Sequence, residues 1–469
     1  NAVRDISQRK VINLIGLGEK FKGAAPTASA AKTLKESANI ESQTLHSFLG
    51  KDQGYVHDRG KATTLRNVRA TYKKSVIFVD EASLIATNLM HSLLKLKEKL
   101  GFKLVLVGDK GQLGAVEAGK DFEQLIKVIP CKKLDQVLRQ KDDSHKKAVV
   151  ELSKGNVAET FKIHDKNIEQ HDKKIVEATV AKYLEGNKTT REKTLLMSPT
   201  KKVRDKINKN VIAELQNEKE ITGKVEKFEA LKQKDFTLAD YNFAMMYEKN
   251  DVVKFINNYK NGIEKGELYK VISCNNTGNR ITLNKDNKEF VFSLRKDVNY
   301  EDKIEVFEKN NLDLQVGLKI IFTKNNKKEG LINSESAKIE KINQDSITFK
   351  MENGDTKTIK KEELKHMNYG YCSTVHSAQG KTYDKSIAAI GDNKMLTTQK
   401  SWCVILSRHK ENFTAIVHDK NRMQAYTISN SGTEMSAIEL EQKQDKLNDI
   451  TNTKNQNIKV NNAIEMSIG

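Results

Sequence analysis

The stretch Ser75-Val-Ile-Phe-Val-Asp80-Glu81-Ala82-Ser83 decides the fold class of this chain. Its apolar, largely β-branched run up to Val79 predicts a strand that is buried on both faces, as in a parallel sheet. An Asp–Glu pair at the end of such a strand suits nucleotide hydrolysis, because one carboxylate can hold Mg²⁺ through water while the next activates the attacking water. The alternative is a solvated strand end with two charges, and adjacent acids alone do not separate the two interpretations.

The neighbouring segments extend this strand into an alternating α/β pattern. Lys103-Leu-Val-Leu-Val107 predicts a second buried strand, and the leucines of 88–100 have helical spacing. In an open α/β sheet the loops after such strands carry the ligand-binding residues. Further segments have the same character: a strand at 193–198, a basic helix at 199–215, and buried strands at 386–390 and 401–406. The sequence therefore predicts an α/β fold.

The middle of the chain has a different texture. From Asp251 to about Lys361, short alternating segments are broken by Gly and Asn turns, which predicts a small β-barrel or sheet inserted between α/β segments. Beyond about Thr427 the chain is polar, and a partly helical or disordered tail is expected. The expected divisions are 1–137 for a first lobe, 138–245 and 366–427 for the two parts of a second lobe, 246–365 for the insertion and 428–469 for the tail.

Composition bounds the class of protein. The 469 residues exceed what one hydrophobic core usually organises, and 81 Lys+Arg against 62 Asp+Glu give a formal charge of +19. A basic balance favours a polyanionic partner, although the Lys- and Asn-rich composition can inflate the charge without one. No apolar run approaches the roughly 18–20 residues that span a bilayer. The 4 cysteines have neither metal nor disulfide spacing, which fits a reducing cytoplasm.

Three further residues strengthen the nucleotide interpretation. Gln112 lies just beyond the second strand, where its amide can contact both a γ-phosphate and the attacking water. Arg139 and Arg408 are natural partners of a phosphoryl group, because guanidinium is permanently cationic and bidentate. A lone arginine is more often part of a surface ion pair. Two arginines in this order behind the Asp–Glu pair and Gly108-Asp109 favour a site.

Several other segments are suited to single-stranded nucleic acid. Pro26-Thr27 opens a helix whose free N–H groups and Thr hydroxyl can bind a phosphate. Ser198-Pro199-Thr200 repeats this arrangement before a basic helix. Taken singly, each such segment is more often an ordinary helix cap or turn. The remaining candidates are Thr44, His46, Thr374 and His376.

The ordered set of these motifs resembles one known family. It comprises Ala-Pro-Thr (25–27), Thr-x-His (44–46), Val-Asp-Glu-Ala (79–82), Gly-Asp-x-x-Gln-Leu (108–113), Arg-Gln (139–140), Ser-Pro-Thr (198–200), Thr-Val-His-x-x-Gln-Gly (374–380) and Ser-Arg (407–408). The set is similar to that of superfamily 1B helicases of the RecD-like group. Within this group it looks most like the helicase part of conjugative relaxases of the TraA/TraI type, and the match runs to about Lys420.

The resemblance implies a fold, an activity and a role for each site residue. It implies two RecA-like P-loop NTPase lobes with a small SH3-like β-barrel inserted in the second, ATP and Mg²⁺ between the lobes, and 5′→3′ movement on single-stranded DNA. It also implies a cytoplasmic monomer that works with other DNA-transfer machinery. By this carry-over, Asp80 is associated with Mg²⁺, Glu81 activates water and Gln112 senses the γ-phosphate. The charge of that phosphate is stabilised by Arg139 and Arg408. The nucleotide site also includes Gly108, Asp109, Gln379 and Gly380, and the residues along the DNA are Pro26, Thr27, Thr44, His46, Thr200, Thr374 and His376.

One motif of the family is missing from the sequence. Neither Gly380-Lys381-Thr382 nor the spaced glycines of 18–23 completes the phosphate-binding pattern Gly-x-x-x-x-Gly-Lys-Ser/Thr. We therefore expect a chain truncated just after this loop, which lacks the first strand, binds ATP weakly and hydrolyses it negligibly. A strand is expected at 11–17, with 17–24 as an extra segment of unexplained origin before Ala25.

Two other functions stay open at this point. One is an ATP-independent single-stranded DNA-binding remnant of a motor. The other is a RecD-like repair helicase unrelated to conjugation, which would carry the same motifs.

Overall fold

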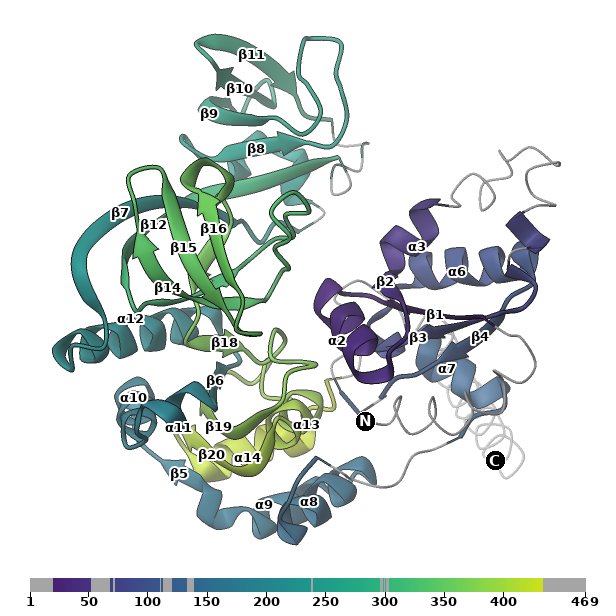
Figure 1. Ribbon diagram of the computed structural model, residues 1–469, viewed down its shortest axis with the longest axis vertical. Coiled ribbons are helices and arrows are strands. Elements are labelled where there is room, and N and C mark those ends of the chain that lie inside the picture. The colour runs from purple at the N-terminus through teal and green to yellow at the C-terminus, as the bar shows by residue number, and fades with distance from the viewer. Residues whose placement is uncertain are drawn as a thin grey trace, which may run out of the picture. The chain divides into compact units, whose positions relative to one another are not determined.

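The computed structural model describes residues 20–51, 68–70, 72–109, 111–112, 120–132, 139–237, 239–295, 298, 300 and 303–432. The chain divides into two compact units. Figure 1 labels their helices and strands. The α/β unit comprises residues 1–200 and 374–469, and the inserted unit comprises residues 201–373.

The first sheet of the α/β unit is parallel and has the strand order β2-β1-β3-β4. Its strands are β1 (Lys20–Ala25), β2 (Ser42–Thr44), β3 (Ser75–Val79) and β4 (Lys103–Leu106). β3 is buried along its whole length and has the predicted bounds, because an apolar run covered on both faces is stable only inside a sheet. The second predicted strand is also present and ends at Leu106.

Helices cover the face of this sheet that carries Ile77 and Val79. They are α3 (Leu45–Lys51), α6 (Thr87–Leu100) and α7 (Asp121–Val128). The predicted leucine spacing places Leu93, Leu96 and Leu100 in the core, and Figure 1 shows α6 running alongside the strands. Gly101 ends α6 with a φ of 74°, a conformation that glycine adopts without strain. The remaining elements of this part are α2 (Ala28–Ala38) and η1 (Ala82–Leu84).

The second sheet of the α/β unit has the order β18-β6-β19-β20-β5. Its strands are β5 (Ile168–Gln170), β6 (Thr194–Ser198), β18 (Cys372–Thr374), β19 (Tyr383–Ile390) and β20 (His409–Val417). β6, β19, β20 and β5 pair in parallel, which confirms the predicted second α/β part. Around it lie α8 (Asp143–Ser153), α9 (Val157–Ile163), η2 (Asp165–Asn167), α10 (Ile175–Leu184), α11 (Lys188–Glu192), α13 (Gln399–Ser407) and α14 (Lys420–Ser429).

The structure corrects one strand prediction in this sheet. Residues 401–406 form most of α13 and not a buried strand. A short apolar run cannot be assigned by periodicity alone when the segment is buried all round, and Trp402, Val404 and Leu406 are all in the core. The signal for a helix is a capping box, in which Thr398 and Ser401 each accept the other's backbone N–H.

The N-terminal prediction also changes. The strand that leads to Pro26 is β1, Lys20–Ala25, which pairs with both β2 and β3. Residues 20–24 are therefore part of the sheet and not an extra segment before Ala25. The strand expected at 11–17 lies outside the described residues, as does the tail from residue 433.

The inserted unit consists of helix α12 (Lys201–Asn217) and two antiparallel sheets, with the orders β11-β10-β9-β8-β12-β7 and β16-β15-β14-β13-β17. Their strands are β7 (Thr222–Gln233), β8 (Val252–Phe255), β9 (Leu268–Asn275), β10 (Arg280–Lys285), β11 (Lys288–Ser293), β12 (Ile304–Val316), β13 (Lys319–Phe322), β14 (Ser336–Ile342), β15 (Ser346–Met351), β16 (Thr356–Lys360) and β17 (Met367–Tyr369). Short 3₁₀ turns occur at η3 (Asp240–Asn242), η4 (Ala244–Met246) and η5 (Lys361–Glu363).

The local sequence explains the strands, but the expected boundary at 246 is wrong. Asp286 and Asn287, with φ of 51° and 62°, form the tight turn between β10 and β11, since both residue types tolerate the left-handed region. β7 begins at Thr222 and pairs with β12, so the β part starts well before 246. The compact unit also includes α12, which we had expected in the second lobe.

None of the helices in the described ranges combines the length and apolarity that a membrane span requires.

Candidate functional site

The carboxyl ends of the first sheet's strands meet at one edge. Ala25 pairs with Thr44, Ala24 pairs with Val79, and Val79 pairs with Leu106. The segments that follow these strands, which begin at Pro26, Leu45, Asp80 and Val107, therefore leave the sheet side by side. In open α/β sheets, ligands bind at this edge.

Asp80 and Glu81 follow β3 in a constrained turn. The Asp80 backbone N–H donates to the Ala24 carbonyl at 3.0 Å, and its carboxylate accepts the Glu81 N–H at 2.9 Å. Glu81 has a φ of 50° and a ψ of 40°, the left-handed conformation that a glutamate rarely adopts. The Ala82 N–H then donates to the Val107 carbonyl at 2.8 Å, which ties the turn to the strand beside it. Backbone strain of this kind is concentrated at functional sites.

Burial raises the pKa of both carboxyl groups. For Asp80 burial is the main cause, and the hydrogen bond from the Glu81 N–H opposes it. For Glu81 burial and the neighbouring charge of Asp80 raise the pKa, while Arg408 and Arg139 lower it. The negative charges of Asp80 and Glu81 repel each other. Binding of a cation or a proton between them is therefore favourable.

Gln112 is fixed by Asp109. The Gln112 Nε2 donates to Asp109 Oδ2 at 3.0 Å, and Asp109 Oδ1 accepts the Gly111 N–H at 2.9 Å. Gly108 allows the backbone to pass close to η1, since a Cβ on Gly108 would lie 3.0 Å from the Ser83 nitrogen. Gly108 and Asp109, predicted for the nucleotide site, thus have structural contacts that shape the loop holding Gln112.

Arg408 lies between the second sheet and Gln112. Its side chain is 1% exposed, and its Nη2 donates to Gln112 Oε1 at 3.3 Å and to Ser407 Oγ at 2.7 Å. Arg139 Nη1 donates to the Ser407 carbonyl at 2.5 Å. The two arginines, distant in the sequence, are therefore held at one helix end.

The charge of these arginines is retained despite burial. Burial, followed by the charge of Arg139, lowers the pKa of Arg408 to about 10, and Glu81 opposes the shift. Burial likewise lowers the pKa of Arg139, against the charges of Glu81 and Asp109. Both guanidinium groups remain cationic at neutral pH and act electrostatically on Glu81. Glu81, Gln112, Arg139 and Arg408 thus lie close together in the structure.

Gln379 and Gly380 lie in the connection between β18 and β19. This connection joins two strands of the same sheet. The Gln379 N–H donates to the His376 carbonyl at 3.1 Å, and Gly380 has a φ of 77° with open space around it. The next carbonyl, that of Lys381, accepts from Arg408 Nη1 at 3.4 Å. The segment therefore reaches the arginine site through Lys381.

The first group of candidate nucleic-acid residues lies at the edge of the first sheet. Thr27 is exposed and caps α2, with its hydroxyl accepting the Ala30 N–H at 3.1 Å. Pro26 is half-buried beside it. Thr44 caps the next helix in the same way, accepting the Ser47 N–H at 3.2 Å, and His46 is exposed. Both threonines serve as ordinary caps, and their hydroxyl protons stay available to a ligand.

The second group lies at the end of β6 and β18. The Val375 N–H donates to the Ser198 carbonyl at 3.1 Å, which brings the turn after Thr374 against the strand that leads to Thr200. Thr374 Oγ1 and Ser377 Oγ are 2.8 Å apart, and this turn leaves His376 exposed.

Sequence reasoning missed an ion pair that joins α13 to α7. Lys400 on α13 donates from Nζ to Glu123 Oε1 on α7 at 3.1 Å, and Lys400 is only 9% exposed. The assignment of 401–406 to a strand hid this lysine. Recognition of the Thr398–Ser401 capping box would have placed Lys400 on a helix.

A second feature that sequence reasoning missed is a buried cluster of His145, His164 and His409. His145 Nδ1 and His409 Nε2 are 2.8 Å apart, and the rings of His145 and His164 lie 4.9 Å apart. Burial lowers the pKa of all three, to about 4 for His164 and about 3 for His409. The cluster adjoins the arginine site, because His409 directly follows Arg408 in the chain.

These histidines are expected to make stability depend on pH. In the unfolded chain the His164 side chain takes up a proton below its ordinary pKa of 6.5, whereas in the folded chain it does so only near its lowered pKa of about 4. The contribution of His164 to the free energy of unfolding is therefore complete above pH 6.5 and is lost as the pH falls toward about 4. His164→Phe should reduce this loss by up to ~1.4 kcal/mol per pH unit. Urea unfolding at several pH values measures it, with the half-exposed His171→Phe as the control. Equal pH slopes in both variants would contradict the assignment.

The site also fits a magnesium ion. Within the described ranges, no three His, Cys, Asp or Glu side chains are grouped closely enough to form a metal site by themselves. Mg²⁺ in nucleotide sites takes one or two carboxylates and completes its shell with water and phosphate oxygens. The half-buried Asp80 carboxylate, whose pKa is raised by partial burial, fits this limited role.

Comparisons with known proteins find relatives of part of this chain. Residues 9–173 match the AAA domain family. The conjugal transfer protein TraA of Agrobacterium fabrum is 32% identical over 150 residues, which are 32% of this chain and 12% of the relative. The ATP-dependent RecD2 DNA helicase of Deinococcus radiodurans is 36% identical over 125 residues, which are 26% of this chain and 16% of the relative. The matched part is therefore a small share of each relative's length.

Among solved structures, a Pif1 helicase from Bacteroides in complex with ADP-AlF3 and ssDNA aligns with a TM-score of 0.47 and 15% identity, over 91% of this chain and 88% of that one. Over the matched part, the chain is similar in sequence to RecD-like helicases and to TraA proteins.

Proposed function

We propose that the chain is the motor region of an ATP-dependent helicase that moves 5′→3′ along single-stranded DNA within a conjugative DNA-transfer protein. The observation that carries the proposal is the convergence of Glu81, Arg139, Arg408 and Gln112 at the end of β3. A protein that only binds DNA has no use for a strained glutamate close to the buried Arg408 and the half-buried Arg139.

Each residue has a role that its surroundings support. Glu81 accepts the proton of the attacking water, since a raised pKa brings a carboxylate closer to the operating pH of a general base. Arg139 and Arg408 stabilise the charge of the transferred phosphoryl group, and Gln112 aligns the water. Mg²⁺ at Asp80 would neutralise phosphate charge. Gln379 and Gly380 lie in the segment that begins at Thr374, and we take them to connect the proposed DNA contact at Thr374 to the nucleotide site.

The proposed DNA contacts lie at two places. Pro26, Thr27, Thr44 and His46 present exposed or half-buried groups at the edge of the first sheet, and the helix N-terminus after Thr27 favours a phosphate. Thr200, Thr374 and His376 offer similar groups beside β6. Hydroxyls and backbone N–H groups of this kind bind the phosphate backbone without reading its sequence.

We extend the proposal to the fold of the inserted unit, the cellular compartment and the oligomeric state. We take its antiparallel strands to include the SH3-like barrel of the resembled family. We also take the protein to act in the cytoplasm as a monomer, alongside other DNA-transfer components.

Two alternatives are separable by experiment. The similarity to the RecD2 helicase favours a RecD-like repair helicase as the second candidate. A conjugative DNA-transfer protein would include a relaxase domain, and a repair helicase would not. An ATP-independent DNA-binding remnant would bind single strands but, even when preceded by a phosphate-binding loop, would not displace streptavidin from a 3′-biotinylated strand on addition of ATP.

Single-stranded DNA binding should depend strongly on salt. Phosphate contacts release about 0.7 counterions each from a single strand, so a logarithmic slope of at least about 2 is expected. Fluorescence anisotropy with a labelled oligothymidine between low and high salt measures this slope. The control is an uncharged peptide nucleic acid of the same base sequence. Equal affinity for both strands, or no salt dependence, would mean that the charge of +19 reflects composition alone.

A further inference from the structure

One buried polar side chain in the inserted unit is unexplained by local sequence rules. The buried stripe of α12 consists of Ile207, Asn208, Val211, Ile212 and Leu215. Asn208 is only 1% exposed, although asparagine is a poor helix former and costs free energy in an apolar core. A residue that violates both rules usually compensates through a specific set of hydrogen bonds.

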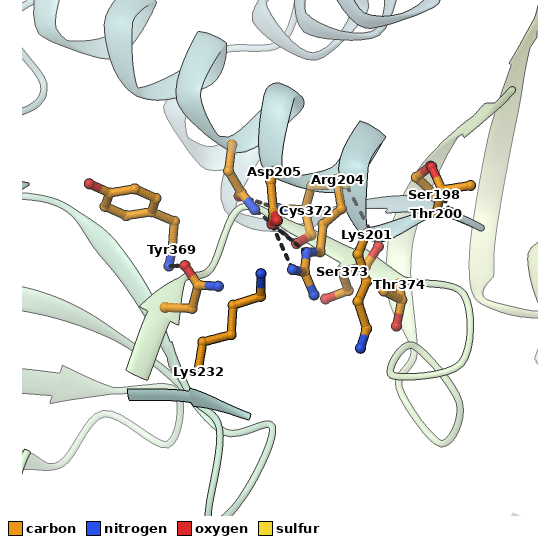
Figure 2. A network of polar contacts seen from close by, with 12 residues as sticks. Ser198, Thr200, Lys201, Arg204, Asp205, Lys232, Tyr369, Cys372, Ser373 and Thr374 are labelled. Atoms are coloured by element: carbon orange, nitrogen blue, oxygen red, sulfur yellow. Dashed lines mark hydrogen bonds and ion pairs between the residues drawn. The ribbon is translucent and has the colours of Figure 1, made fainter. Parts of the chain in front are cut away.

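Asn208 makes that set with the connection between β17 and β18. Its Oδ1 accepts the backbone N–H of Tyr371 at 3.0 Å and of Cys372 at 2.8 Å. Its Nδ2 donates to the Cys372 carbonyl at 3.3 Å. The amide orientation is fixed by these partners, because only the oxygen can accept two N–H groups. Figure 2 shows Cys372 and Ser373 beside the turn of α12 that carries Arg204 and Asp205.

The other side of the same connection is fixed by β13. The Gly370 N–H donates to the Lys319 carbonyl at 2.9 Å, and Tyr371 Oη accepts the Lys319 N–H at 3.2 Å. A Cβ on Gly370 would lie 2.6 Å from the Ile320 carbonyl carbon, so the two backbones pack as closely as glycine permits. The chain therefore leaves the inserted unit from a rigid support.

The proposed DNA-binding turn comes directly after this support. Ser373 is the last residue of the inserted unit, and Thr374 begins the turn that exposes His376. The helix that carries Asn208 begins immediately after Thr200, another proposed DNA contact. Asn208 thus joins the first helix of the inserted unit to its last residues, next to both places where the chain enters and leaves that unit.

We propose that Asn208 is a positioning residue for DNA binding, which sets the conformation of Tyr371–Ser373 and through it the place of Thr374. This inference rests on the proposed function. Asn208 itself, being buried, does not touch DNA.

The test uses Asn208→Asp and Asn208→Leu in the full chain. The aspartate keeps the shape and the oxygen that accepts both N–H groups, but it places a second oxygen against the Cys372 carbonyl. The leucine removes all three hydrogen bonds without adding a charge, and it serves if the aspartate variant does not fold. Asn210→Asp, on the same helix and outside its buried stripe, is the matched control. Thermal unfolding by circular dichroism checks that each variant is folded at the assay temperature.

Two readouts test the proposal. Cys372 is 3% exposed, so its labelling by a thiol reagent, followed by mass spectrometry, reports whether the connection opens. Both Asn208 variants should label faster than wild type, and their affinity for labelled oligothymidine should fall about tenfold, as expected for a lost bond to a buried group. Asn210→Asp should change neither.

A double-mutant cycle with Thr374→Val decides between positioning and general destabilisation. If Asn208 acts through Thr374, the double variant binds DNA no more weakly than the weaker single variant. Fully additive effects, or unchanged affinity despite faster Cys372 labelling, overturn the proposal and leave the proposed function standing. No binding of oligothymidine by the wild-type chain overturns the proposed function and this inference together.

Discussion

Replacing Glu81 by Gln is expected to reduce ATP hydrolysis by about 10²–10⁴-fold while leaving ATP binding intact. The amide has the same shape as the carboxyl group but cannot accept the proton of the attacking water. It also removes the repulsion between Glu81 and Asp80 that contributes to the raised pKa of Glu81. Nucleotide affinity should therefore stay the same or increase.

The measurement needs a form of the chain preceded by a phosphate-binding loop, because the 469-residue sequence does not contain this motif. Phosphate release with oligothymidine present gives the rate, and a fluorescent ATP analogue gives the affinity. Glu98→Gln, on the exposed side of α6, is the control for the same chemical change elsewhere. Hydrolysis within about tenfold of wild type would remove Glu81 from the role of general base.

The 469-residue chain should be assayed in parallel, and hydrolysis no greater than that of its own Glu81→Gln variant is expected. Clear hydrolysis that Glu81→Gln abolishes would mean that other residues bind the phosphates.

Arg408→Lys is expected to lower the rate of hydrolysis by about 10³-fold with little change in KM for ATP. Lysine keeps the positive charge but not the planar fork, so it cannot donate at once to Gln112 Oε1, Ser407 Oγ and the Lys381 carbonyl. The loss should appear in kcat, because the guanidinium acts on charge that develops in the transition state.

Arg422→Lys is the matched control for this substitution. Arg422 lies on α14 in the same unit, forms an exposed ion pair with Asp392 and has no contact with the arginine site. A rate within about threefold of wild type for Arg408→Lys would indicate that Arg408 supports the fold only. A rise in KM with unchanged kcat would indicate ground-state binding instead.

Much of the fold was predictable from local patterns. The apolar run before Asp80 is buried on both faces and forms β3 as expected, and the leucine spacing at 88–100 matches α6. Residues 401–406 were wrongly predicted as a strand, because a helix buried all round has no polar face to reveal its period. The start of the β part was placed too late, since the exposed and charged β7 lacks a clear apolar alternation.

The proposed chemistry of this protein follows from its amino-acid sequence. Asp80, Glu81, Gln112, Arg139 and Arg408 are recognisable from residue type, order and their place after predicted strands. Only the tertiary structure decided how they are supported: the left-handed backbone of Glu81, the Asp109 contact that fixes Gln112, and the three bonds of Asn208. The physical reason is that the bonds of Asn208 to Tyr371 and Cys372 join residues 163 and 164 positions apart, and that backbone bonds to Ala24 and Val107 hold the turn at Glu81; the spacing of neighbouring residues encodes neither.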